Sequence, residues 1–73
     1  MQGVVRQDRA GSIFVEADGR RYDSPELDAP EGTEVEVEPF TGFGDIACAT
    51  LSWTLFESSY TVLDAREDPF WTP

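Results

Sequence analysis

Residues 12–24 have the sequence SIFVEADGRRYDS, in which two runs of strand-forming residues flank the pair Asp18-Gly19. An Asp-Gly pair supplies the positive φ angles that a two-residue type I′ turn requires. This stretch therefore predicts a β-hairpin, the strongest local signal in the chain. Upstream, residues 3–8 (GVVRQD) predict another strand and residues 9–11 a tight connection, so the N-terminal part predicts a three-stranded meander.

The middle of the chain contains a loop and then an alternating strand. Residues 24–32 (SPELDAPEG) hold two prolines and a glycine and predict a loop, because proline interrupts regular helix. In the following TEVEVE, valine alternates strictly with glutamate after Thr33. Successive strand side chains point to opposite faces, so Val35 and Val37 are expected on the dry face and the glutamates on the other.

Residues 39–45 (PFTGFGD) predict a glycine-containing aromatic loop, and residues 47–55 then place apolar side chains at every odd position. This period of two predicts a strand. A helix that begins at an Asp45 cap stays open as an alternative, since it would group Ile46, Ala49, Trp53 and Phe56 on one face.

The C-terminal part predicts a last strand over residues 60–65 (YTVLDA), after a connection at residues 57–59. Residues 67–73 form a tail in which two prolines flank Phe70-Trp71, and we expect it either to fray or to fold back onto the barrel mouth.

Length and strand spacing together predict an all-β fold. The chain has 73 residues, enough for one small core. Short strands with frequent turns indicate a five- to six-stranded barrel of the OB or SH3-like kind, with a small sandwich as the alternative. We expect a single domain over residues 1–66 and a short tail over residues 67–73.

Charge is the most informative global property. Fifteen acidic residues oppose five arginines, with no lysine or histidine, for a net charge of −10. Four arginines and three acids give residues 1–21 a net charge of +1, whereas one arginine and twelve acids give residues 22–73 a net charge of −11. This balance argues against binding to a phosphate backbone. An acidic surface that serves solubility, as in halophilic proteins, is the alternative to a functional one.

Several classes of function are not expected. The chain offers no histidine or lysine and one cysteine, Cys48, which we expect to be a small core residue. We therefore predict no enzymatic activity, no catalytic residues, no cofactor and no metal. No apolar run is long enough for a membrane helix and no secretory signal is evident, so we expect a cytoplasmic or virion-associated protein without membrane contact.

Candidate binding residues fall into two groups. The protein-binding candidates are acidic residues that could face a basic partner and aromatic residues that could anchor it, namely Glu34, Glu36, Glu38, Phe40, Phe43, Phe70 and Trp71. The anion-binding candidates are the arginines of the meander, Arg6, Arg9, Arg20 and Arg21. The alternatives are a solvated acidic face, aromatics that plug the barrel ends, and arginines that pair with nearby acids.

Segments 3–5, 12–26 and 29–38 follow an order that resembles small OB-type barrels, in particular the C-terminal domain of the NfeD family and, more loosely, cold-shock domains. The cold-shock resemblance implies binding of single-stranded nucleic acid by aromatics interleaved with basic residues. This chain lacks the lysines and histidines of that pattern. The NfeD resemblance implies a domain appended to membrane proteases or scaffolds.

The sequence thus favours a non-catalytic module that binds a protein with a basic surface, such as a phage or mobile-element inhibitor that mimics nucleic-acid charge. One alternative is a structural or accessory subunit of a virion or larger complex, for which self-association stays open. A second alternative is a binder of single-stranded nucleic acid that uses the arginines with Phe14, Tyr22 and Phe43 as a stacking surface.

Overall fold

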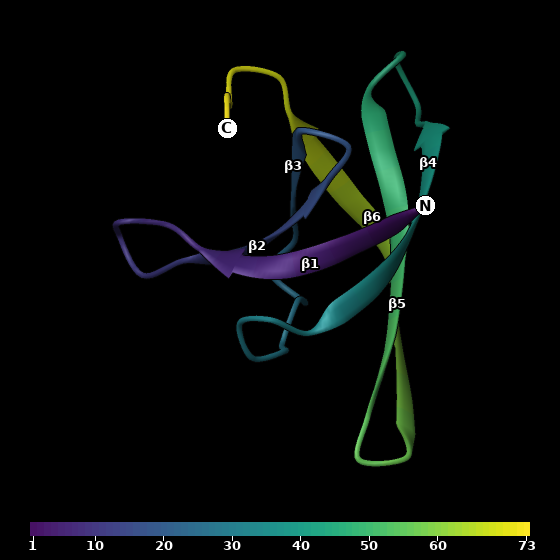
Figure 1. The fold of residues 1–73 in the computed structure, drawn as a ribbon. Helices are drawn as coiled ribbons and strands as arrows, with labels where there is room; N and C mark the ends of the chain where they lie inside the picture. Colours follow the sequence, from purple (N-terminus) through teal and green to yellow (C-terminus); the bar gives the residue numbers. More distant parts are fainter.

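The computed structural model describes residues 1–73, which form six antiparallel strands and no helix (Figure 1). The strands are β1 (Gln2–Gln7), β2 (Ile13–Ala17), β3 (Arg20–Asp23), β4 (Glu34–Thr41), β5 (Ala47–Leu55) and β6 (Ser58–Asp68). They follow the order β1-β2-β3-β6-β5-β4, and β4 pairs back to β1. The prediction of a small all-β barrel is therefore confirmed.

No helix is present that is long and apolar enough to cross a membrane.

The predicted hairpin is formed by β2 and β3. Ala17 pairs with Arg20, and the two residues between them, Asp18 and Gly19, have φ angles of 54° and 72°. These are the positive values expected of a type I′ turn. The predicted meander is also present, because β1 pairs antiparallel with β2.

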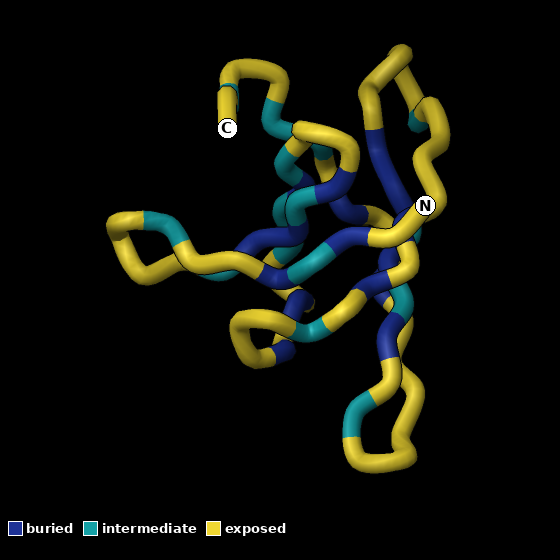
Figure 2. Tube along the Cα trace, in the orientation of Figure 1, coloured by how far each residue is buried: buried dark blue, intermediate teal, exposed yellow.

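The core is built from inward-facing residues of all six strands (Figure 2). Val35 and Val37 of β4 are fully buried, while the glutamates that alternate with them, at positions 34, 36 and 38, are exposed, as the alternation predicted. Tyr22 of β3 is among the largest fully buried side chains. Burial raises the pKa of its phenol, and the nearby Glu67 carboxylate acts in the same direction.

β1 passes very close to its neighbours at Gly3. A Cβ atom at this position would lie 2.8 Å from Val15 Cγ1 and 2.9 Å from the Glu16 carbonyl oxygen. Such distances are shorter than real Cβ contacts, so the glycine lets β1 fit between β2 and β4. The barrel closes at this point, because Gly3 pairs with Val35.

Residues 47–55 form strand β5, so the helical alternative is wrong. Ala49, Leu51 and Trp53 are buried, in agreement with the period of two. The end residues depart from it, since Ala47 is exposed and Leu55 is only half-buried. Cys48 is buried, as expected.

The pairing of β5 with β6 contains a bulge. Ala49 pairs with Ala65 but Leu51 pairs with Val62, so Thr50 alone lies opposite two residues of β6. A bulge shifts the alternation of side chains by one residue. This shift explains why Val62 and Ala65, three positions apart, both point into the core.

The end of the β5–β6 hairpin projects away from the body of the barrel (Figure 1). Its turn consists of Phe56 and Glu57, between the paired residues Leu55 and Ser58. The connection was expected at residues 57–59, so the strand begins earlier than predicted. β6 also continues to Asp68, into the segment expected to be tail.

Candidate functional site

The outer face of β4 carries a row of three glutamates, Glu34, Glu36 and Glu38, which we call the acidic strip. All three are exposed. Their positions follow from the alternation with Val35 and Val37, whose burial fixes the strand's orientation. Successive outward side chains on a strand lie about 6.5–7 Å apart, so the strip presents its carboxylates at a regular interval.

No cationic side chain compensates the acidic strip. Glu36 pairs across the sheet with Gln2 and Ser52, and Glu38 pairs with Thr50. The one ion pair of the strip joins Glu36 Oε1 to the N-terminal amine of Met1 at 3.3 Å. The strip is therefore a source of negative potential on the barrel surface.

Two of the predicted aromatic anchors continue the line of the strip. Phe40 is the next outward residue of β4 and is 41% exposed. Phe43 lies in the following loop and is 100% exposed. A fully exposed phenylalanine buries no apolar surface on folding and so does not stabilise the fold. Exposed aromatic side chains are typical anchors of protein interfaces.

The other two predicted anchors lie elsewhere. Trp71 folds back onto Phe14 of β2, with ring centroids 5.5 Å apart in an edge-to-face arrangement. It is half-buried there, so its role is at least partly structural. Phe70 is exposed and unpacked. The strand β1 separates β2 from β4 in the barrel, and the tail therefore does not extend the strip.

The predicted arginine patch is largely neutralised by ion pairs. Arg6 pairs with Glu16, Arg20 with Glu67 at 3.3 Å, and Arg21 with two carboxylates. Arg9 is exposed and takes part in no ion pair. Three of the four candidates for anion binding thus have an acidic partner within the chain.

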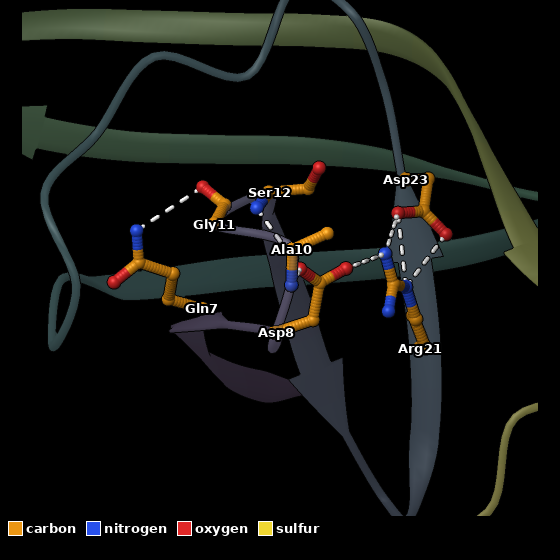
Figure 3. A network of polar contacts seen from close by, with 7 residues as sticks. All are labelled: Gln7, Asp8, Ala10, Gly11, Ser12, Arg21 and Asp23. Atoms are coloured by element: carbon orange, nitrogen blue, oxygen red, sulfur yellow. Dashed lines mark hydrogen bonds and ion pairs between the residues drawn. The ribbon is translucent and has the colours of Figure 1, made fainter.

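Arg21 occupies the centre of a polar network between the β1–β2 turn and β3 (Figure 3). It donates to Asp8 Oδ2 at 3.1 Å and, through Nε, to both carboxylate oxygens of Asp23 at 3.0 Å. Its guanidinium carbon lies 4.2 Å from the ring centroid of Phe14. Burial opposes the charge of Arg21, but the hydrogen bonds with Asp23 and Asp8 prevail and raise its pKa.

Asp8 organises the turn that Arg21 holds. Its Oδ1 accepts hydrogen bonds from the backbone amides of Ser12 and Ala10, each at 2.9 Å. The Ser12 bond is the largest cause that lowers the pKa of the Asp8 carboxyl, and the contact with Arg21 adds to it. The charges of this network thus stabilise the β1–β2 turn and its contact with β3.

Sequence reasoning missed a groove of about 520 Å³ at the base of the β5–β6 hairpin. One wall consists of Trp53, Phe56 and Tyr60, and the other includes Glu26 and Asp28 from the loop between β3 and β4. The odd-position pattern of β5 placed Trp53 in the core. Nothing in the sequence indicated that a distant acidic loop would lie opposite it.

The chain contains no cluster of three or more cysteine, aspartate or glutamate side chains arranged to hold a metal ion.

A scan against protein-family models, a search of curated proteins and a search of solved structures each find no match to this chain. The resemblance to NfeD and cold-shock domains stays a prediction.

Proposed function

We propose that this protein is a non-catalytic interaction module that binds a basic protein through the acidic strip, with Phe40 and Phe43 as apolar anchors. The observation that carries the proposal is the absence of cationic side chains around the strip, while Arg6, Arg20 and Arg21 are paired on other strands. An uncompensated charged face costs the compact state self-repulsion, and a complementary partner relieves it.

The partner class that fits best is a protein that itself handles nucleic acid. The regular row of carboxylates offers such a protein negative charges at an interval on the scale of successive phosphates in one nucleic-acid strand. A small inhibitor of this kind, encoded by a phage or mobile element and acting in the cytoplasm, would compete with the partner's nucleic acid.

The experiment is an affinity capture from host lysate at low salt and at about 0.5 M salt, where the Debye length is roughly 4 Å. The wild-type chain is compared with the triple variant Glu34→Gln, Glu36→Gln, Glu38→Gln. We expect a basic, nucleic-acid-handling protein to be retained by the wild type at low salt, released at high salt and lost from the variant.

The matched control is the triple variant Glu31→Gln, Glu57→Gln, Asp64→Asn, which removes the same net charge from exposed residues that form no ion pair. Capture by this control should resemble that by the wild type. Equal loss of the partner from both variants would mean that total charge, and not the strip, governs binding, and would contradict the proposal.

A structural subunit of a virion or larger complex is the second candidate, favoured by the full exposure of Phe43 and the near-full exposure of Phe70. Such a subunit would associate through apolar surface and retain its partner, or itself, at both salt concentrations. The stacking surface of a single-stranded nucleic-acid binder finds less support, because Phe14 and Tyr22 are buried.

A further inference from the structure

The groove between the β5–β6 hairpin and the loop of residues 24–32 has features that the acidic strip does not share. Leu27 and Ala29 of this loop are buried in the core, which fixes the loop against the barrel. Glu26 and Asp28 alternate with them and remain exposed. The loop thus holds two carboxylates along one wall of the groove.

The opposite wall is aromatic. Trp53 and Tyr60 pair across the hairpin and stack with ring centroids 5.7 Å apart and planes at 17°. Tyr60 remains 45% exposed and Phe56 is 94% exposed at the turn. Aromatic faces attract cations through the negative charge on their π-systems.

The turn that carries Phe56 is strained. Phe56 and Glu57 have φ angles of 50° and 70°, in the left-handed region that costs non-glycine residues free energy. Asn and Gly would fill these positions without that cost. Strain of this kind tends to be kept where a side chain serves a function, and here it holds an aromatic ring at the groove mouth.

Two further groups at the groove lack partners. Trp53, which lines the groove, carries the chain's one buried side-chain nitrogen or oxygen without a hydrogen-bond partner, the indole Nε1, and such groups are rare in native proteins. Nε1 is a donor, so an acceptor such as a backbone carbonyl of a bound segment, and not a guanidinium, can pair with it. In addition, β3 pairs with β6 only from Arg66 onward, so the stretch from Ser58 to Ala65 is paired on its β5 side alone. An open strand edge is a template for an added strand.

We propose that this groove binds an arginine side chain carried by an extended segment of a partner protein. No lysine, arginine or histidine lines the groove, and neither of its two carboxylates forms an ion pair within the chain. A planar guanidinium can stack on Tyr60 and Phe56 while it donates to Glu26 or Asp28. The segment's backbone pairs with the open edge of β6.

No residue of the acidic strip lines the groove, although Glu36 lines a neighbouring hollow together with Trp53 and Tyr60. The test of the groove does not depend on the strip's partner. The probe is a seven-residue peptide of alternating threonine and arginine, titrated into the isotope-labelled chain and followed by nitrogen–proton NMR. A matched peptide carries citrulline, which keeps the shape of arginine and removes its charge. Only two indole signals exist, from Trp53 and Trp71, so the Trp53 signal reports directly on the groove.

We expect the arginine peptide to shift the Trp53 indole signal and the amide signals of residues 59–63, and the citrulline peptide to leave them unchanged. The double variant Glu26→Gln, Asp28→Asn should weaken binding about tenfold, because it removes the charge-assisted hydrogen bonds. The double variant Asp18→Asn, Asp45→Asn makes the same change in net charge at exposed residues that lie outside the groove lining and form no ion pair, and it should change affinity less than about twofold.

Three outcomes would overturn the proposal. Equal binding of the citrulline peptide would show that the guanidinium is not recognised. Equal weakening by the two double variants would show general attraction to an acidic protein. No shift of the Trp53 indole at about 5 mM arginine peptide would show that the groove does not take this ligand.

Discussion

Arg21 shows how one side chain can join three parts of the barrel. It contacts Asp8 in the β1–β2 turn, Asp23 in its own strand, and the ring of Phe14 in β2. Phe14 in turn meets Trp71 of the tail. Because its side chain is 15% exposed, loss of either carboxylate leaves the guanidinium partly buried with fewer acceptors.

The substitution Asp8→Asn tests this network through its pH dependence. The folded-state pKa of Asp8 is lowered, so its charge stabilises the fold above the unfolded pKa of about 3.9, and that stability is lost as the pH falls through the folded value. We expect the variant to be less stable than the wild type at pH 7. The difference in urea midpoint should shrink below about pH 4 and vanish once the Asp8 carboxyl of the wild type is protonated and neutral, like the amide of the variant.

Asp64→Asn is the control, since Asp64 is exposed and forms no ion pair. It removes one negative charge from a chain of net charge −10 and should not lower the stability at pH 7. If the Asp8→Asn difference stays constant from pH 7 to pH 2.5, the charge of Asp8 is not what stabilises the turn.

Individual inward and outward positions were predictable where neighbours along the strand decide them. Val35 and Val37 alternate with glutamates, and a one-residue shift of register would bury three charges. The position of Trp71 was not predictable, because it depends on Phe14, fifty-seven residues earlier in the sequence, lying on the outside of the barrel.

At the scale of elements, two hairpins share one backbone geometry with different residues. The β2–β3 turn uses Asp18-Gly19 and the β5–β6 turn uses Phe56-Glu57, all at positive φ. The first was evident from its residues and the second was not, since phenylalanine and glutamate carry no signal for a left-handed conformation.

The double variant Phe56→Asn, Glu57→Gly should therefore stabilise the fold. Both residues accept positive φ at little cost, and we expect a gain of about 1–2 kcal/mol in the free energy of unfolding. For a domain of this size, that gain corresponds to a rise in Tm of roughly 4–16 °C. Thermal and urea unfolding provide the measurement.

A second readout separates strain from function. The same variant removes the ring of Phe56 from the groove, so it should bind the arginine peptide more weakly than the wild type while being more stable. The single variant Glu57→Gly relieves part of the strain and leaves Phe56 in place, and should keep the peptide affinity. A double variant that is less stable than the wild type would show that the turn is not strained.

The groove could not be predicted from the sequence, because it depends on how separate elements pack against one another. Its acidic wall is a loop whose composition predicted only irregular structure, although Leu27 and Ala29 anchor it in the core. The bulge opposite Thr50 likewise leaves no signal, because it depends on the pairing of β5 with β6 and not on either strand alone. Both arise from contacts between segments far apart in the chain.

At the scale of the whole molecule, charge is distributed unevenly over the barrel. The ion pairs made by arginines involve β1, β2, β3, β6 and the β1–β2 turn, while the acidic strip on β4 has only the N-terminal amine. The excess of acidic residues was evident from composition. The strand order was needed to show that the arginine ion pairs and the unpaired carboxylates of the acidic strip lie on different strands of the barrel.

This distribution predicts how salt acts on stability. The exposed ion pairs each contribute about 1 kcal/mol or less, so their screening costs little. Screening of repulsion among carboxylates in a chain of net charge −10 favours the compact state. Between about 0.01 and 0.5 M NaCl the Debye length falls from roughly 30 to 4 Å, and we expect Tm to rise by roughly 4–8 °C, equivalent to about 1 kcal/mol.

The triple variant Glu34→Gln, Glu36→Gln, Glu38→Gln locates the source of the effect. If the unpaired strip carries much of the repulsion, this variant starts with a higher Tm at low salt and gains less from added salt than the variant Glu31→Gln, Glu57→Gln, Asp64→Asn, which has the same net charge. A fall in the wild-type Tm with salt would mean that the arginine ion pairs outweigh the repulsion. The strip would then cost the fold little, and an acidic face without a cost is explained by solubility alone.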